Sequence, residues 1–563
     1  MSTPAKKLLN KTENVVSEMI EGALLAHSGL VSLVPHNVLM RRDYNLVKSD
    51  NVALISGGGS GHEPSHAGFV GKGMLTAAVL GGVFASPTAN AVYAAICEVT
   101  GPKGCLLIVK NYTGDRLNFG IAAEKAKAKG LKVNMVIVGD DVAVNAGEES
   151  NGTITGRRGL SGTLFVHKVA GAAAEAGETL DDVTAAARTV AGAVGSMGVA
   201  LTTCTVPGSA VSSRIPENHM ELGLGIHGEP GRELVPVRSV DSVVNTIVDQ
   251  INKVVPLRSK RLALMINNLG GTPLMELYVA ARAAYNYLTT GFNAKVERMY
   301  VGSFMTSLEM QGLMVTCFVV ENPLQMARID AFTSAPAWPK NARVAENTEA
   351  GSVVHAVNMD VKEDVFGAPD PEIVGRLKMA CQVIIENEQR LNALDAIVGD
   401  GDCGLTMKRG AVAILDQLGR LPSSVPASLC TALAKIIQTS MGGTSGAILD
   451  IMLSAAAAHF MEQGATWPEA FQKAVDAASF YGGAKEGYRT MLDALIPAAR
   501  KAMEGGSTAD IVAAANEGAN KTATMTPLAG RSSYLSIDQV NGTEDPGAVA
   551  AALVLDSLLQ SKL

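Results

Sequence analysis

The hydrophobic pattern changes from strand-like to helix-like about two-thirds of the way along this chain of 563 residues, and this change constrains the fold most. In the first part, short apolar runs at 52–56, 105–110 and 133–141 alternate with alanine-rich stretches. Gly, Asn or Asp ends or follows each run. This alternation is typical of buried parallel strands with crossover helices, where ligands bind at the carboxyl ends of the strands.

A second group of strand-like runs follows, and then a region of different composition. The runs lie at 262–271, 296–302 and 313–320, which indicates a second α/β lobe. Pro, Ala, Asn and Glu dominate from about 333 to 371 without apolar periodicity, as in an interdomain linker. Beyond it we expect helices, at 373–395, 425–441 and 447–463.

These patterns predict a multidomain protein. We expect an N-terminal α/β domain at 5–335, whose two lobes divide near residue 190. A linker at 336–370 should lead to an all-α domain at 371–560. A length of 563 residues fits this division, because single domains usually hold about 100–200 residues.

Charge and cysteine content exclude several function classes. Lys and Arg number 47 against 54 Asp and Glu, a net charge of −7, so no basic nucleic-acid surface is expected. The seven cysteines are scattered without a CxxC pair and indicate reduced thiols in a cytoplasmic protein. The longest apolar stretches, such as 74–85, are too short to span a membrane.

The chain holds 58 glycines, and their spacing can be compared with the common nucleotide motifs. GxxxxGK[ST] does not occur, which disfavours a P-loop. The glycine run 57–61 after the first predicted strand does not give GxGxxG, because His62, Glu63 or Pro64 stands where the third glycine is needed, and this disfavours a Rossmann cofactor site there. The segment 62–66, HEPSH, matches the HExxH pattern of zinc proteases. That pattern needs a helix interior, and Pro64 between the histidines with Gly61 before them argues against one.

Two loops after predicted strands carry polar side chains suited to a small ligand. The loop 56–66, SGGGSGHEPSH, lets backbone N–H groups approach a ligand, on which His62 can act. In the loop 110–120, Lys110 can bind an oxygen and Asp115 can act as a base. The structural alternatives are a tight turn and a charged surface loop.

A third loop, MELGLGIHGEPG at 220–231, places His227 among glycines. An unprotonated imidazole is a nucleophile, and with a carbonyl compound it can form a hemiaminal. The alternative is a structural histidine.

Three carboxylates, Asp395, Asp400 and Asp402, occur within eight residues. Like charges this close are costly unless a cation neutralises them. Gly404 and Leu405 stand where an EF-hand needs other residues, so Mg²⁺ held together with substrate phosphates is expected rather than Ca²⁺. A structural carboxylate turn is the alternative. Glycine loops at 440–446 and 526–534 add anion-binding groups.

Taken together, six segments closely resemble the single-chain ATP-dependent dihydroxyacetone kinases, which include the triokinases. In chain order they are SGGGSGHEPSHAGFVGKGML, IVKNYTGDRLNFG, ELGLGIHGEPG, GDGDCG, SMGGTSGA and EDPGAV. The resemblance implies ATP-dependent phosphorylation of dihydroxyacetone, and of D-glyceraldehyde, to the triose phosphate. It also implies a helical barrel that binds ATP at one end, and a homodimer whose domains cross.

The resemblance also implies roles for individual residues. His227 would hold the substrate covalently as a hemiaminal, and Asp115, assisted by His62, would act as acid/base. Gly59, Ser60, Gly61 and Lys110 would line the substrate, and Asp395, Asp400 and Asp402 would hold two Mg²⁺ ions. The nucleotide would contact Asp400, Gly401, Asp402, Cys403, Thr444, Ser445, Gly482, Thr490, Met491, Arg531, Asp545, Pro546 and Gly547.

Three alternatives stay open. Animal members of the family also split FAD into AMP and cyclic FMN, an FAD-AMP lyase activity for which Mn²⁺ is a candidate metal. A non-catalytic regulator is disfavoured by the intact GDGDCG and GIHGEPG segments. Phosphate supply from a carrier protein is disfavoured because both domains are joined in one chain without a carrier domain.

Overall fold

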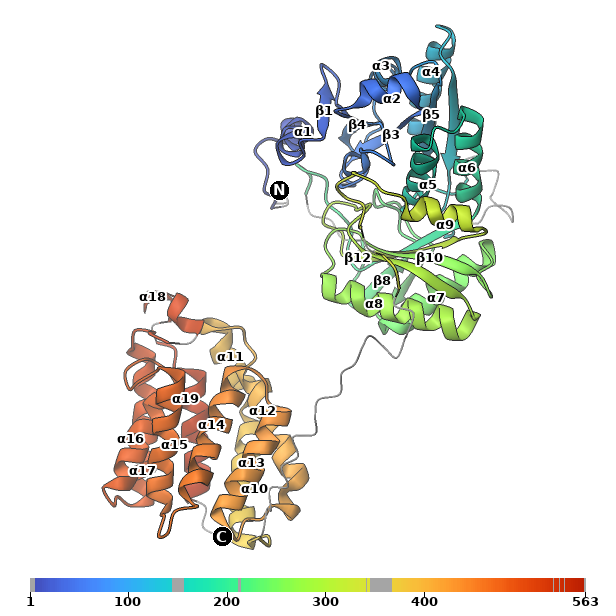
Figure 1. Cartoon of the computed structure of the whole chain (residues 1–563). Helices are drawn as coiled ribbons and strands as arrows, with labels where there is room; N and C mark the ends of the chain where they lie inside the picture. The colour runs from blue at the N-terminus through green and yellow to red at the C-terminus, as the bar shows by residue number, and fades with distance from the viewer. Residues whose placement is uncertain are drawn as a thin grey trace. The chain divides into compact units, whose positions relative to one another are not determined.

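The computed structural model describes residues 6–143, 156–210, 214–340, 342–344, 367–529, 531–535, 537–540 and 542–560. The chain divides into two compact units, Met1–Val353 and Val354–Leu563. Figure 1 shows strands and helices in the first unit and helices in the second. The multidomain fold class is therefore confirmed, whereas the ranges given above for domains and linker stay predictions.

The first lobe is a six-stranded sheet in the order β1-β2-β4-β3-β5-β6. The inner strands are parallel and the two at the β1 edge are antiparallel. Apolar side chains on both faces of β3 are buried, as expected for a sheet that helices cover on both sides. The strands are β1 (Leu30–Leu33), β2 (Val38–Arg41), β3 (Ala53–Ser60), β4 (Ala77–Val83), β5 (Cys105–Lys110) and β6 (Val133–Val138).

Helices pack on the two faces of this sheet. One face, with Ile55 and Leu107, packs against α2 (Tyr44–Asp50), α3 (Ala89–Val99) and α4 (Thr113–Lys127). The other face, with Leu54 and Leu106, packs against α1 (Val15–Ala26), α5 (Thr163–Glu175) and α6 (Leu180–Gly192). The parallel strands and crossover helices predicted for this part of the chain are confirmed.

The second lobe is also a six-stranded sheet, in the order β11-β10-β12-β7-β8-β9. Only the β10–β11 pair is parallel among its described pairings. The strands are β7 (Val194–Ala200), β8 (His219–Leu222), β9 (Glu233–Pro236), β10 (Arg261–Asn268), β11 (Lys295–Gly302) and β12 (Gly312–Val319), and the helices are α7 (Val240–Val254), α8 (Leu274–Asn286) and α9 (Pro323–Asp330).

The two lobes share one core through α5. Val166 and Val169 of this helix belong to the same buried cluster as Met314 and Phe318 of β12. The other face of the second sheet packs against α7 and α8. After α9 the chain stays on this unit, where Trp338 packs at 4.7 Å from the Tyr300 ring.

The second unit is a closed ring of helices. Eight of its described helices form the ring, in which each helix packs against the next and the last packs against the first. In order they are α10, α12, α13, α14, α15, α16, α17 and α19. The ring encloses an apolar cavity of about 740 Å³. The bounds are α10 (Pro371–Glu386), α11 (Glu388–Val398), α12 (Cys403–Gln417), α13 (Pro426–Ser440), α14 (Gly443–His459), α15 (Trp467–Gly482), α16 (Leu492–Met503), α17 (Thr508–Lys521), α18 (Ile537–Val540) and α19 (Pro546–Gln560).

The helical barrel confirms the fold that the resemblance implies, with one local difference. The single helix expected at 373–395 is divided into α10 and α11 at Asn387, whose side-chain amide donates to the carbonyl oxygen of Val383. Asn competes for helix backbone groups in this way and favours such breaks. Within the described part of the chain, no helix has the length and hydropathy needed to cross a membrane.

Candidate active site

The first unit brings residues of three predicted loops together, although residues 56–60 belong to strand β3 and Asp115 lies in helix α4 rather than in a loop. His62 follows β3, Lys110 ends β5, and His227 lies in the loop after β8 of the other lobe. The His62 and His227 rings are 4.8 Å apart at an angle of 73°. Loops from both lobes therefore form one histidine-containing site.

Glu229 fixes the orientation of His227. Its Oε1 lies 2.7 Å from Nδ1 of His227, and its Oε2 accepts the His227 backbone N–H at 2.9 Å. Because a carboxylate only accepts hydrogen bonds, the neutral ring carries its proton on Nδ1 and has a lone pair on Nε2. Burial alone would raise the pKa of Glu229, but the hydrogen bond with His227, and the positive charge of this ring when it is protonated, lower it to about 2.

Glycine is required beside this pair. A Cβ on Gly225 would lie 2.1 Å from Oε2 of Glu229, closer than any real contact. The backbone N–H of Gly228 donates to the carbonyl oxygen of Gly225, which closes the turn around His227. The glycines of the segment 225–228 therefore allow the carboxylate to reach the ring.

His62 presents the same tautomer. Its Nδ1 lies 2.8 Å from the carbonyl oxygen of Thr306, which can only accept, so Nδ1 carries the proton. Nε2 is buried and has no hydrogen-bond partner among the described residues. Burial and the charge of Lys110 hold the pKa of His62 well below its usual value. His62 therefore offers an Nε2 lone pair to a ligand.

Lys110 and Asp115 approach each other over Gly58. An ideal Cβ on Gly58 would lie 3.4 Å from Nζ of Lys110 and 3.6 Å from Oδ2 of Asp115. Nζ is buried without a hydrogen-bond partner in the described structure. Burial lowers the pKa of Lys110, and the charge of Asp115 opposes this effect. The ammonium is therefore a donor in need of a ligand oxygen.

Two aromatic rings complete the surroundings of His227. Phe84 and Tyr112 pack edge-on against it, with ring centroids at 5.1 and 4.8 Å. Phe84 also stacks on His62 at 5.0 Å. Such packing holds both imidazoles in fixed orientations.

The glycine-rich segment 59–61 packs against Phe84. Gly59 and Gly61 have no room for a side chain because Phe84 lies within 3 Å of an added Cβ at either position. The hydroxyl of Ser60 donates to the carbonyl oxygen of Gly81 at 2.7 Å. The backbone N–H of Gly61 donates to the carboxylate of Glu63. Direct substrate contact by Gly59, Ser60 and Gly61 stays a prediction.

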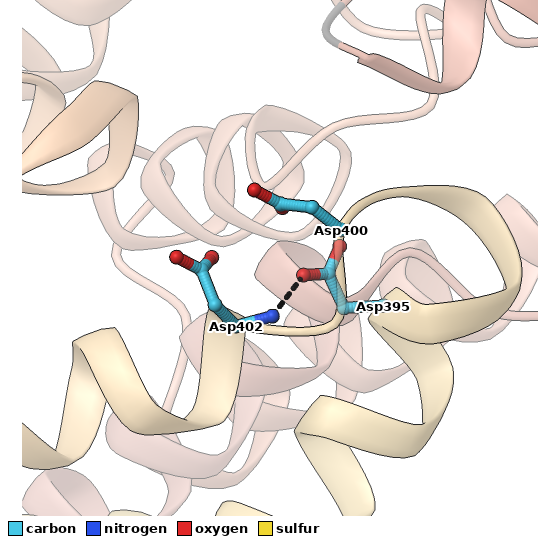
Figure 2. Close-up of side chains that lie close together, drawn as sticks. All are labelled: Asp395, Asp400 and Asp402. Carbon is cyan, nitrogen blue, oxygen red and sulfur yellow. Dashed lines mark hydrogen bonds between the residues drawn. The ribbon is translucent and has the colours of Figure 1, made fainter. Parts of the chain in front are cut away.

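The second unit gathers the three predicted carboxylates at one loop. Asp395 lies in α11, whereas Asp400 and Asp402 lie between α11 and α12. Their nearest oxygens all lie within 4.8 Å of one another (Figure 2). Oδ2 of Asp395 accepts the backbone N–H groups of Asp402 at 2.9 Å and Cys403 at 3.1 Å. A cluster of carboxylate oxygens suits a hard cation, so these residues fit Mg²⁺.

The predicted nucleotide contacts are distributed over several helix ends. Thr444 and Ser445 lie in the first turn of α14, and Gly482 ends α15. Oδ1 of Asp545 accepts the N–H of Ala548 at the start of α19. An added Cβ on Gly547 would lie 3.5 Å from Cβ of Met491. Pro546 is the first residue of α19. The backbone N–H of Thr490 donates to the carboxylate of Asp493. The side chain of Arg531 lies outside the described residues.

Sequence reasoning missed several residues of these sites. Glu229 lies within the GIHGEPG segment, and its position two residues after His227 could have indicated a carboxylate partner for the ring. Phe84 and Tyr112 gave no signal, because their role depends on contacts between lobes. Arg489 is fully buried, and its charge acts on the predicted nucleotide residue Asp545. Only its Nη2 has a hydrogen-bond partner among the described residues, the carbonyl oxygen of Thr543.

Comparison with known proteins defines the class. Residues 21–337 match the Dak1 domain and residues 397–560 match the DAK2 domain. The chain therefore belongs to the family of single-chain dihydroxyacetone kinases.

Individual members of the family match along almost their whole length. A Solanum lycopersicum protein named "Putative 3,4-dihydroxy-2-butanone kinase" is 46% identical over 98% of this chain and 97% of its own. The Homo sapiens triokinase/FMN cyclase is 40% identical over 99% of each chain. The crystal structure of the Citrobacter freundii dihydroxyacetone kinase with AMP-PNP and Mg²⁺ superposes with a TM-score of 0.67, at 38% identity over 99% of this chain and 100% of that one.

Proposed function

We propose that this protein is an ATP-dependent kinase that phosphorylates dihydroxyacetone, and D-glyceraldehyde, to the triose phosphate. The observation that carries the proposal is the His227 site: Glu229 holds the ring at Nδ1, the His62 ring lies 4.8 Å away, and Lys110 in the same unit has a buried ammonium without a partner among the described residues. A short polyhydroxy carbonyl compound matches these groups, because it offers an electrophilic carbon and several hydroxyls. The names of the family members agree with this substrate class.

His227 would bind the substrate covalently. Its Nε2 attacks the carbonyl carbon, so a C–N bond forms while the C=O π bond breaks and the oxygen takes up a proton from water. The ring becomes an imidazolium whose charge Glu229 stabilises, and loss of its Nδ1 proton through Glu229 to water leaves the neutral hemiaminal, so protons and charge balance. Glycerol has no carbonyl and cannot form this hemiaminal.

Asp115 and His62 would then activate the free hydroxyl. Asp115 accepts the proton of this hydroxyl as phosphoryl transfer proceeds. The Nε2 lone pair of His62 accepts a hydrogen bond from a substrate hydroxyl and so assists Asp115. Lys110 binds a substrate oxygen through its unpaired Nζ. The covalent bond supplies positioning, which is a large part of catalysis for phosphoryl transfer.

The helical unit would present the nucleotide. Asp395, Asp400 and Asp402 would hold Mg²⁺, which neutralises phosphate charge when bound. Thr444 and Ser445, in the first turn of α14, would supply backbone N–H groups to the phosphates. Mn²⁺ is a second candidate metal for the same carboxylates.

We also propose a homodimer whose units cross, because the triose and nucleotide residues lie on different units of the chain. Mixed dimers of His227→Ala and Asp400→Ala chains test this arrangement. Crossed units restore one intact site in each mixed dimer, about one quarter of wild-type turnover after random pairing. Sites formed within one chain restore none.

The free thiols of all seven cysteines favour the cytoplasm, which cell fractionation can test.

Two single substitutions test the reaction itself. His227→Ala should lose turnover of dihydroxyacetone while the protein still binds Mg·ATP, because the two sites lie on different units. Asp400→Ala should lose turnover at ordinary Mg²⁺ concentrations. Near-wild-type turnover by either variant would refute the role assigned to that residue.

A second activity is supported by the human relative, whose name includes FMN cyclase. Cleavage of FAD to AMP and cyclic FMN would use the same carboxylate cluster, because it is also a reaction at a metal-bound phosphate. Incubation of the protein with FAD and Mn²⁺ tests it. Cyclic FMN that is absent with Asp400→Ala supports the activity, and no cyclic FMN from the wild type rejects it.

A further inference from the structure

A second pair of histidines, which the proposed reaction does not use, is buried in the first unit. His66 is 1% exposed and His167 is fully buried. Nδ1 of His66 lies 3.0 Å from Nε2 of His167, and the rings are 5.2 Å apart at 64°. His66 ends the loop that carries His62, whereas His167 lies on α5. Their bond therefore connects the His62 loop to the helix on which the core of both lobes is built.

Both rings of this pair are neutral. Burial and the charge of Lys110 hold the pKa of His66 well below its usual value. The same two causes lower the pKa of His167 to about 3. In a hydrogen bond between two neutral imidazoles, one ring donates its only N–H and the other accepts.

The pair is costly to bury. Nε2 of His66 and Nδ1 of His167 have no hydrogen-bond partner among the described residues. A buried polar atom without a partner is destabilising, and two apolar side chains would avoid that cost. Pairs of this kind therefore need an explanation other than stability alone.

The opposite side of the same loop is held by the second lobe. The hydroxyl of Ser65 donates to the carbonyl oxygen of Phe304 at 2.8 Å. The hydroxyl of Thr306 donates to the carbonyl oxygen of Glu63, also at 2.8 Å. These bonds, with the contact between His62 and Thr306, tie the loop to the segment 304–308. The His66–His167 bond ties it to α5, so the loop is held from both sides.

We propose that His66 and His167 are positioning residues, which clamp the 61–66 loop to α5 and so hold His62 against His227. The inference rests on the proposed kinase function. A directional hydrogen bond fixes the loop more closely than apolar packing does, and a neutral pair can do this without adding charge near Lys110. A misplacement of about 1 Å at a catalytic group can cost about 100-fold in rate.

Leucine and amide variants of the pair test the clamp. His66→Leu and His167→Leu remove the bond, whereas His66→Asn and His167→Gln keep a polar group near the positions of Nδ1 and Nε2. We expect the leucine variants to lower kcat/KM for dihydroxyacetone by about 100-fold, with KM for ATP unchanged. The double leucine variant should lose no more than either single one, because the two residues act as a unit. The amide variants should stay close to the wild-type rate.

Equal losses in the leucine and amide variants, additive losses in the double variant, or wild-type rates throughout would overturn the clamp. Hydrogen exchange of the backbone amides at 61–69, measured without substrate, separates this inference from the proposed function. Faster exchange in the leucine variants and wild-type exchange in the amide variants support the clamp even if no triose is phosphorylated. Unchanged exchange in the leucine variants contradicts it even if the kinase activity is established.

Discussion

The carboxylate of Glu229 contacts His227 twice, with Oε1 2.7 Å from the ring Nδ1 and Oε2 2.9 Å from the backbone nitrogen. One contact sets the tautomer of the ring, and the other fixes the loop that carries it. A nucleophilic imidazole needs both, because its Nε2 lone pair must be available and must point at the substrate.

Glu229→Gln should lower kcat for dihydroxyacetone by roughly 100-fold, since the uncharged amide stabilises a developing imidazolium less well than the carboxylate does. Binding of Mg·ATP should not change, because Glu229 lies in the other unit. Steady-state kinetics and calorimetry measure the two quantities. Wild-type kcat in the variant would show that the carboxylate only packs against the ring.

Glu229 should also make folding stability depend on pH in the acid range. Its pKa is about 2 in the folded protein against an ordinary value of 4.5. A lowered carboxyl pKa contributes stability that is present above pH 4.5 and is lost as pH falls from 4.5 towards 2. Denaturant unfolding of the wild type and of Glu229→Gln should therefore show a difference that shrinks over this interval. A difference that grows at low pH would contradict the assignment.

Gly225→Ala should displace Glu229, because the new Cβ would lie 2.1 Å from its Oε2. We expect a loss of dihydroxyacetone turnover of at least about 10-fold with little change in Mg·ATP binding. Gly120→Ala is the matched control, since a Cβ on Gly120 of α4 meets nothing within 4 Å and alanine favours helix there. Equal activity of both variants would mean that the Glu229 contact does not matter.

Removal of one carboxylate from the cluster of Asp395, Asp400 and Asp402 should change the melting temperature of the helical unit in opposite directions with and without metal. Without metal, Asp400→Asn relieves repulsion between like charges and should raise the melting temperature of the helical unit. Added Mg²⁺ should raise the melting temperature of the wild type but hardly that of the variant. Scanning calorimetry with and without Mg²⁺ measures both. Equal Mg²⁺ stabilisation of the two proteins would place the metal elsewhere.

Much of the fold could be predicted because local patterns determine it. The run 105–110 coincides with β5 (Cys105–Lys110), and the run 296–302 falls within β11 (Lys295–Gly302). The mainly antiparallel second sheet could not be predicted, because buried apolar runs show burial and not strand direction. The break at Asn387 inside an apolar pattern was missed for a similar reason, since it depends on one side-chain hydrogen bond.

The closeness of candidate site residues could be predicted best where they lie within one segment. The three carboxylates are close in sequence, and the structure places their oxygens within 4.8 Å. The meeting of His62 with His227 depends on how two lobes pack, which spacing along the chain does not reveal. The His66–His167 bond was missed because His167 lies in an ordinary apolar helix pattern, and His66 was considered only as part of a protease motif.

The most direct test is ADP release from ATP and Mg²⁺ with dihydroxyacetone, D-glyceraldehyde and glycerol compared side by side. A covalent His227 site predicts ADP release with the two carbonyl compounds and none with glycerol, because glycerol cannot form the hemiaminal. The same assay with His227→Ala should show no ADP release with any of the three. No ADP release from the wild type with either triose, or equal release with glycerol, would contradict the account.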